Sequence, residues 1–312
     1  MTGPCRGAVV CHHDAGSTLP RPAYRPAPVP PEVMMNERPA SPWRIEDVDV
    51  PGYLSALDVD AAQLAAAPRD LGLLERLHRA HVFTFPFSNV EVLLGRHPGV
   101  ELATAQDQLV RRRRGGYCFE HSQLFAAVLE TLGFTVRRAL GRERSFDSPR
   151  THMTVLVDLA GTRYLCDPGF GFSITGPIPL DDGARRVEGD RTFSIGWVTD
   201  EGWPVWSFER DGAMEHVLDE STIHPADVRM GHLQTSTGAE SIFRHHLMVM
   251  KHTPRGHVTV TEHGTTVRTP GRPTRQRELT APEIVTEVRD LGVRITGEED
   301  AQLTDVVTRM RG

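Results

Sequence analysis

The chain has 312 residues, which is enough for about two domains of ordinary size. Hydrophobic residues make up 39% of it and charged residues 24%, a balance that supports a buried core and excludes a disordered or collagen-like chain. No stretch reaches the roughly 18 consecutive apolar residues of a membrane-spanning helix, so we expect no membrane association. The net charge of −6 gives no electrostatic basis for binding nucleic-acid phosphates, so we expect no nucleic-acid partner.

The four cysteines are Cys5, Cys11, Cys118 and Cys166. Four cysteines in a chain of this length do not make a disulfide scaffold, and no C-x-x-C pair indicates a zinc site. The N-terminus lacks the apolar segment of a secretory signal, so we expect a cytoplasmic protein with reduced thiols. A free cysteine in that setting is either a packing residue or a nucleophile.

Residues 1–42 form a proline-rich segment with nine of the 23 prolines and no apolar periodicity. Because proline lacks an amide donor and fixes φ, we expect a disordered N-terminal extension or sequence upstream of the true start. Cys11, His12 and His13 lie within it. A lone cluster of this kind lacks further ligands, and we predict no metal site in the chain.

Residues 43–133 have the spacing of a helical domain. Over 71–81 the helical steps of three and four residues are carried by Leu71, Leu74, Leu77 and His81. A second helix is predicted from Cys118 toward Leu132, with Gly133 as its terminator.

Residues 134–245 change to a period of two, which indicates a β domain. The predicted strands are 135–140, 152–157, 163–167, 193–198 and 203–208. Residues 246–312 combine a predicted hairpin with two capping boxes, each opening a short amphipathic helix. The hairpin strands are 257–261 and 265–269, and the capping boxes are Thr280 with Glu283 and Thr296 with Glu299.

Cys118 is placed for reactivity. It follows Gly115 and Gly116, which allow a close approach of the backbone, and it opens the predicted helix. Helix N-termini carry unsatisfied amides and partial positive charge, both of which favour thiolate over thiol. A cysteine that served only packing would sit more naturally in the middle of the apolar stripe.

A nucleophilic cysteine needs a base, and the base needs an orienting partner. If residues 158–161 form a four-residue loop, His152 lies directly opposite Asp167 on the neighbouring strand, with Cβ atoms about 4.5–5.5 Å apart. This register predicts an Asp–His hydrogen bond. It also points Cys166 to the other face beside Met153, where we interpret it as a core residue. Cys118, His152 and Asp167 together predict a catalytic triad.

Three segments now resemble the signature segments of the arylamine N-acetyltransferases. They are Arg-Gly-Gly-Tyr-Cys-Phe-Glu at 114–120, Thr-His-Met at 151–153 and Asp-Pro-Gly-Phe-Gly at 167–171. Further segments are similar to other parts of this family: 86–90 with 93–95, and 235–237 with 241–243. The resemblance covers roughly residues 43–312.

The resemblance implies an α+β fold of three domains around a papain-like Cys-His-Asp core. These would be a helical bundle at 43–133 carrying the nucleophile, a β-barrel at 134–245 carrying His152 and Asp167, and an α/β lid at 246–312. The chain-order interpretation above reaches the same sequence of parts from periodicity alone.

The resemblance also implies acetyl-CoA as acyl donor and an arylamine or hydrazine as acceptor. Cys118 would take the acetyl group as a thioester in a ping-pong reaction, and an amine would then remove it, with His152 accepting the amine proton. By analogy with papain-type pairs, Cys118 and His152 would rest as thiolate and imidazolium. Phe87, Phe170 and Phe243 would line the acceptor pocket, although each of them also fits simple core packing.

The chain departs from the family pattern at three positions. Ser88 stands where the family usually has a glutamate that pairs with an arginine like Arg114, so we expect Arg114 to lack its partner. His121 replaces a commoner glutamine or leucine, and Pro168 replaces a residue that is often β-branched. The triad is unaffected, but the acceptor is left open.

Several alternatives remain open. An amide synthase would take an acyl chain from a carrier protein instead of acetyl-CoA, and a transglutaminase-like or hydrolytic enzyme would use the same triad order. The latter usually has tryptophan after the cysteine, where this chain has Phe119. A non-enzymatic binding module is a further alternative. The run at 111–114 is a solvated loop or lies near CoA phosphates, and the glycines of 169–171 do not match a dinucleotide fingerprint.

Overall fold

The computed structural model of the protein describes residues 41–312, apart from the side chain of Ala65. Except for Ser41 and Pro42, the predicted N-terminal extension lies outside the described residues, and so do the cysteine and histidines at 11–13. Within 41–312, no helix has both the length and the apolar character needed to cross a membrane.

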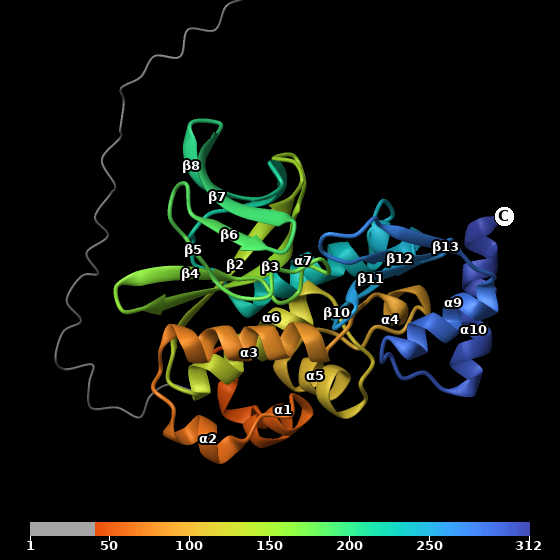
Figure 1. The fold of residues 1–312 in the computed structure, drawn as a ribbon, viewed down its shortest axis with the longest axis horizontal. Helices are drawn as coiled ribbons and strands as arrows, with labels where there is room; N and C mark the ends of the chain where they lie inside the picture. The colour runs from red at the N-terminus through yellow and green to blue at the C-terminus, as the bar shows by residue number, and fades with distance from the viewer. Residues whose placement is uncertain (1–40) are drawn as a thin grey trace, which may run out of the picture. The chain divides into compact units, whose positions relative to one another are not determined.

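Helices build the first part of the described chain (Figure 1). They are α1 (Val50–Ala56), α2 (Ala61–Ala66), α3 (Leu71–Thr84), α4 (Val90–Leu93), α5 (Leu102–Gln106) and α6 (Cys118–Thr131), with short helical turns at Ile45–Asp47 and Asp107–Arg111. Asp70 caps the N-terminus of helix α3, and its carboxylate accepts a hydrogen bond from the Leu73 N–H. Leu74 and Leu77 are buried as predicted, whereas Leu71 on the first turn is exposed.

Helix α6 is the central helix of the protein. It begins at Cys118 and is followed by Gly133 in the left-handed region, as predicted (φ 92°). Its first twelve residues are all buried. A helix that is buried around its whole circumference must be covered on every side. Here α3 and α5 cover one side, and strands β2 and β3 cover another.

An eight-stranded antiparallel sheet forms a nearly closed barrel, with the order β5-β4-β3-β2-β9-β8-β7-β6. Its strands are β2 (Thr135–Glu143), β3 (Arg150–Leu159), β4 (Thr162–Cys166), β5 (Ile178–Pro179), β6 (Arg185–Glu188), β7 (Arg191–Asp200), β8 (Trp203–Arg210) and β9 (Ala213–Leu218). All five strands predicted between 135 and 208 are present. The barrel core is apolar and includes Leu156, Leu165, Phe193 and Phe208.

The register predicted for β3 and β4 is wrong. Leu159 pairs with Thr162, so the hairpin turn contains only Ala160 and Gly161 instead of four residues. Both have positive φ, at 49° and 83°, which is the conformation of a two-residue turn that matches strand twist. Cys166 consequently pairs with Val155, not with Met153, although it is buried in the core as expected.

A second, five-stranded sheet has the order β1-β10-β11-β12-β13. Its strands are β1 (Phe87–Ser88), β10 (Val249–Thr253), β11 (Gly256–Thr261), β12 (Gly264–Arg268) and β13 (Arg275–Glu278), and the remaining helices are α7 (Pro225–Thr237), α8 (Ile242–His245), α9 (Ala281–Asp290) and α10 (Gly297–Arg311). The predicted hairpin β11–β12 and both capping boxes are present. Strand β1 comes from the helical part of the chain, so this sheet joins residues that are distant in sequence.

Candidate active site

Cys118 is the first residue of α6. Gly115 leads into the helix with a φ of 70°, and a side chain there would meet the Pro86 carbonyl oxygen at 2.7 Å. Only glycine allows this approach without strain. The Cys118 thiol is buried and donates a hydrogen bond to the Thr151 carbonyl oxygen, with Sγ and O 3.4 Å apart.

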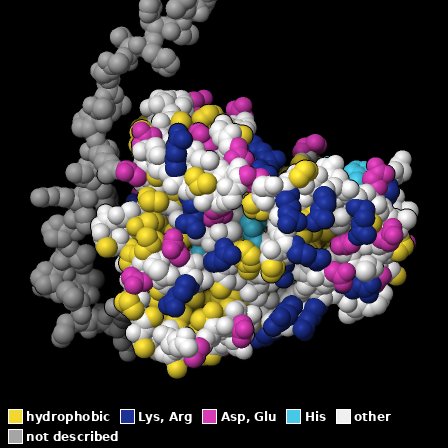
Figure 2. Space-filling view, viewed as in Figure 1, with side chains coloured by type: hydrophobic (Ala, Val, Ile, Leu, Met, Phe, Trp, Pro, Cys, Tyr) yellow, Lys and Arg dark blue, Asp and Glu magenta, His cyan; other side chains and the backbone are white. Residues whose placement is uncertain are grey.

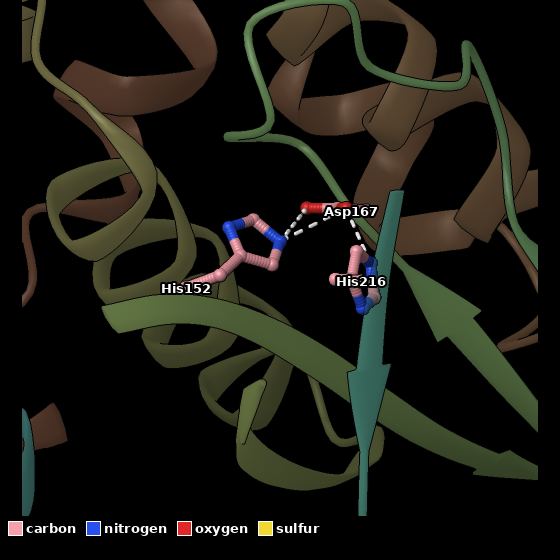
Figure 3. Close-up of side chains that lie close together, drawn as sticks. All are labelled: His152, Asp167 and His216. Carbon is pink, nitrogen blue, oxygen red and sulfur yellow. Dashed lines mark hydrogen bonds and ion pairs between the residues drawn. The ribbon is translucent and has the colours of Figure 1, made fainter. Parts of the chain in front are cut away.

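His152 and Asp167 are hydrogen-bonded in the interior (Figure 3). The His152 Nε2 atom lies 3.1 Å from Oδ1 and 3.0 Å from Oδ2 of Asp167. The predicted hydrogen bond between His152 and Asp167 is therefore present, although the β3–β4 register from which it was predicted is wrong. Asp167 follows the last residue of β4, so the sheet ladder does not fix its position. His152 itself pairs with Gly141 on β2.

The second ring nitrogen of His152, Nδ1, is buried and has no hydrogen-bond partner within residues 41–312. Cys118 and His152 lie close enough to shift each other's pKa. Because Nε2 is bound to Asp167, Nδ1 is the nitrogen available to the thiol. Cys118, His152 and Asp167 thus come together in the order that a thiol, a base and an orienting carboxylate require.

Burial and charge act in opposite directions at this site. Burial alone would lower the pKa of His152, but the negative charge and hydrogen bond of Asp167 hold that pKa well above its ordinary value. Burial also opposes ionisation of Asp167, yet the imidazoles of His152 and His216 keep the pKa of this carboxyl far below its usual range.

The pKa of the Cys118 thiol is shifted in the direction opposite to the one expected. Burial raises this pKa, and the neighbouring His152 opposes the rise without reversing it. Position at a helix N-terminus favours the thiolate, but a fully enclosed sulfur loses more hydration than the helix end replaces. The expectation of a resting thiolate at Cys118 therefore does not agree with its surroundings.

A second histidine, His216 on β9, also contacts Asp167 (Figure 3). Its Nε2 atom lies 3.1 Å from Asp167 Oδ2, and its side chain is completely buried. Burial lowers the pKa of His216, so its imidazole is neutral. The sequence analysis did not identify this residue, because no motif surrounds it and its orientation depends on a local irregularity of β9.

One ligand atom each from His152, Asp167 and His216 lie within 4.8 Å of one another, which raises the question of a metal ion. Both ring nitrogens point at the carboxylate at ordinary hydrogen-bond distances. Structural zinc takes four protein ligands, and no further histidine, cysteine or acid joins these three among the described residues. We interpret the cluster as a hydrogen-bonded set.

The three phenylalanines predicted for the acceptor pocket lie around the triad. The Phe170 ring meets His152 edge-on, with centroids 5.1 Å apart. The rings of Phe87 and Phe243 are 6.1 Å apart, and both belong to the apolar cluster that contains Cys118. Their surroundings are compatible with both the pocket and the core-packing interpretation.

Arg114 does not lack a partner, contrary to expectation. Its buried guanidinium forms ion pairs with Glu91 of α4 and Glu299 of α10. Glu91 follows Ser88 by three residues and supplies a carboxylate from within the same short segment. Glu299, 185 residues away in the chain, attaches the last helix to the segment that precedes Cys118.

His121 lies one turn after Cys118 and belongs to a buried chain of hydrogen bonds. Its Nε2 atom faces the Pro86 carbonyl oxygen at 3.3 Å, and its Nδ1 atom lies 2.9 Å from His81. His81 in turn lies 2.9 Å from the Tyr53 hydroxyl. Since the carbonyl can only accept, each imidazole must donate through Nε2, and the Tyr53 hydroxyl donates to His81.

A cavity of about 360 Å³ lies next to Thr151, the residue before His152. It is bordered by Leu140 of β2, Thr151 and Ile223, and by Met230 and Gln234 of α7. Thr151 connects the cavity to the site, because its carbonyl oxygen accepts the Cys118 hydrogen bond. The lining offers apolar surface together with a few polar groups, as ligand pockets usually do.

Comparison with known proteins agrees with these features. The N-acetyltransferase family model matches residues 70–296. An arylamine N-acetyltransferase of Escherichia coli K12 is 32% identical over 220 residues, which cover 69% of this chain and 78% of that relative. One from Mycolicibacterium smegmatis is 43% identical over 148 residues, covering 44% and 52%.

Solved structures agree as well. The arylamine N-acetyltransferase of Mycobacterium abscessus has a TM-score of 0.80 and 26% identity, covering 88% of this chain and 99% of that one. The Mycobacterium marinum enzyme in complex with CoA has a TM-score of 0.71 and 25% identity, covering 84% and 99%. With the family match, the extent of the relatives and the shared fold taken together, this chain belongs to the arylamine N-acetyltransferases, a family of acetyl-transferring enzymes.

Proposed function

We propose that the protein transfers an acetyl group from acetyl-CoA to an arylamine or hydrazine through a thioester at Cys118. One observation carries this proposal: a cysteine at the start of α6 lies beside a histidine whose other nitrogen is bound to a buried aspartate. The acetyl-transferring activity of the family supports it. The free thiols Cys118 and Cys166 are consistent with action in the reducing cytoplasm, which we include in the proposal.

In the first half-reaction, the Cys118 proton passes from Sγ to His152 Nδ1 while Sγ forms a bond to the carbonyl carbon of the donor. The bond between that carbon and the CoA sulfur breaks, and CoA takes the proton from His152. Asp167 makes His152 a stronger base, because its charge stabilises the imidazolium. The acetyl group remains on Cys118.

In the second half-reaction, the amine nitrogen attacks the acetyl carbon and its proton passes to His152 Nδ1. The bond to Sγ breaks, and the proton returns from His152 to the Cys118 sulfur. The two products leave separately, which is the condition for ping-pong kinetics. Each residue thus returns to its starting protonation state.

The donor is proposed to approach through the cavity beside Thr151. CoA is the ligand of the related Mycobacterium marinum structure, which supports acetyl-CoA here. The cavity fits an extended donor arm in two respects: Leu140, Ile223 and Met230 offer apolar contacts, and Thr151 lies next to the thiol. On the acceptor side, the rings of Phe87, Phe170 and Phe243 would hold an aromatic amine by edge-on or stacked contacts.

Intact mass spectrometry tests the proposal. The protein is mixed with acetyl-CoA in the absence of an amine, and we expect a single acetyl adduct that an arylamine then discharges. Cys118→Ala should form no adduct, whereas the matched change Cys166→Ala at the other buried thiol should retain it. An adduct that persists in Cys118→Ala contradicts the proposal.

The amide-synthase alternative differs in its donor. The relatives reported above are arylamine N-acetyltransferases, and no observation in the described residues favours a carrier-protein partner. The same experiment separates the two functions. If Cys118 stays unmodified in acetyl-CoA but is acylated by a carrier-bound acyl chain, the carrier-bound chain replaces acetyl-CoA as the donor.

A further inference from the structure

We propose that His216 is a positioning residue of this site, a second imidazole that holds the Asp167 carboxylate in the orientation that His152 requires. The inference rests on the roles proposed above for Cys118, His152 and Asp167. It assigns to β9 a part in a site whose other members come from α6, β3 and the segment after β4.

The need for such a residue follows from the position of Asp167. It lies beyond the end of β4, so no strand pairing orients it. Its carboxylate contacts His152 through both oxygens and His216 through Oδ2 alone. A carboxylate with one partner can rotate about its terminal bond, whereas two donors from different strands fix its plane.

The backbone is arranged to bring both histidines to this carboxylate. Strands β3 and β9 flank β2, and each carries a β-bulge directly before its histidine. On β3 the extra residue is Thr151, and on β9 it is Glu215. Bulges near active sites redirect the side chain that follows. A β-bulge thus precedes each of the two histidines that contact Asp167.

Strand β2 leaves room between the two histidines. Gly141 pairs with His152 on one side and with Leu218 on the other. A Cβ atom at this position would lie 2.9 Å from the Val217 carbonyl oxygen and 3.4 Å from His216 Nδ1. A side chain at Gly141 would therefore displace the strand or the ring that contacts Asp167.

The chemistry distinguishes the roles of the two imidazoles. A carboxylate only accepts hydrogen bonds, so both Nε2 atoms carry a proton in the Asp167 pair. The Nδ1 atom of His152 is available to Cys118, whereas Nδ1 of His216 is buried and has no partner among residues 41–312. A neutral His216 donates its hydrogen bond without adding a positive charge that would compete with protonated His152.

Two substitutions test the inference. His216→Phe keeps an aromatic ring and removes the donor, and His216→Gln keeps a donor at similar reach. We measure the rate of Cys118 alkylation by iodoacetamide against pH, the rate of acetyl-adduct formation, and kcat and KM for the amine. For His216→Phe we expect adduct formation to slow by about 10- to 100-fold with KM little changed, and His216→Gln to restore most of the rate.

The pH profile supplies a readout that a purely structural role would not move. Without the His216 donor, more of the Asp167 charge acts on the Cys118–His152 pair, so the alkylation profile of His216→Phe should move to higher pH. The titratable and charged groups around Asp167 and the Cys118–His152 pair are Cys118, Glu143, His121, His152, Cys166, Arg186, His216 and His78. All except His216 are unchanged in the variant.

Three outcomes would overturn the inference. The first is a rate and pH profile in His216→Phe equal to those of the unaltered protein. The second is an equal loss in His216→Gln and His216→Phe. The third is stoichiometric metal in the purified protein that either substitution removes. Alkylation needs no acetyl donor, so the absence of an acetyl adduct in the unaltered protein would count against the proposed function and leave this test intact.

Discussion

Asp167 is the residue on which the charge balance of the site depends. It is completely buried, accepts hydrogen bonds from two imidazoles and carries a pKa far below its usual range. An ion in the interior is stable only with close partners, and here both partners donate through nitrogen. The same charge raises the pKa of His152, so that residue becomes a better acceptor for the thiol proton.

Asp167→Asn replaces this carboxylate by an amide of nearly the same shape, so it tests the effect of the negative charge. In Asp167→Asn the burial of His152 remains while the stabilising anion is lost, so the pKa of His152 falls below its value in the unaltered protein. We expect the rate of acetyl transfer to fall by roughly 10³–10⁴-fold with the fold retained. Steady-state kinetics with circular dichroism measures both.

A matched control for this prediction lies in the same hairpin. Asp158 on β3 pairs with Arg163 at the surface, and Asp158→Asn removes one carboxylate charge away from the triad. We expect it to keep nearly all of the activity. A loss comparable to that of Asp167→Asn would show that the hairpin is sensitive to any such change.

At the scale of elements, the ion pairs of Arg114 join the helical part of the chain to its last helix, α10. Glu91 of α4 and Glu299 of α10 both bind the guanidinium, just upstream of Cys118. Burial works against ionisation of Glu299, yet Arg114 and the Thr296 N–H lower the pKa of this carboxyl to about 2. The ion pair between Arg114 and Glu299 holds α10 against the segment that leads into α6 and Cys118.

Glu299→Gln should destabilise the fold by about 2 kcal/mol at neutral pH, because Arg114 loses one of its two charged partners. A carboxyl with a lowered pKa stabilises the folded state above its unfolded pKa and loses this effect as the pH falls. The difference in unfolding free energy between Glu299→Gln and the unaltered protein should therefore shrink between about pH 4.5 and about pH 2.

Urea denaturation at several pH values measures this difference. Glu298→Gln on the same helical turn is the control, since Glu298 is exposed and accepts a hydrogen bond from Gln302 on its own helix. We expect a change of less than about 0.5 kcal/mol for it. Equal effects for the two substitutions would contradict the role given to Arg114.

Element identity could be predicted where local signals are strong. Two glycines before an apolar stripe indicated that a helix begins at Cys118, and the capping boxes at Thr280 and Thr296 located α9 and α10. The hairpin register failed because Ala160 adopts positive φ, which is uncommon for a residue with a side chain. A shorter turn then shifted every pair along the ladder.

Parts of the site were beyond sequence reasoning for physical reasons. His216 reaches Asp167 through a bulge, and a bulge changes which way each following side chain points. The partnership of Arg114 with Glu299 spans 185 residues, so no local pattern indicates it. The proposed site residues could be predicted because each of them lies in or beside a recognisable sequence segment. They are Cys118, His152 and Asp167.

At the scale of the whole molecule, Asn89 joins the helical part of the chain to the second sheet. Its side-chain amide donates to the Phe243 and His246 carbonyl oxygens at 2.8 and 2.7 Å, and its Oδ1 atom accepts from the Met248 N–H at 2.8 Å. The side chain is fully buried. It therefore satisfies three backbone groups of the segment 243–248.

Asn89→Ala should leave those three groups unpaired and lower the free energy of unfolding by about 3 kcal/mol. The substitution also removes the hydrogen bond that holds the Phe243 backbone. We therefore expect a higher KM for the arylamine, with the acylation rate of Cys118 nearly unchanged. Urea denaturation measures the free energy of unfolding, and steady-state kinetics measures KM.

Gln302→Ala, at an exposed amide on α10, is the control and should change neither the free energy of unfolding nor KM. An Asn89→Ala protein of undiminished stability would contradict the role given to Asn89.

The burial of Cys118 also determines how readily its thiol is oxidised. Exposed thiolates attack peroxides and disulfides, whereas this sulfur is 2% exposed and burial raises its pKa. The only other free thiol within 41–312, Cys166, is also buried, and burial raises its pKa well above the ordinary value, so neither cysteine is a ready target for oxidants.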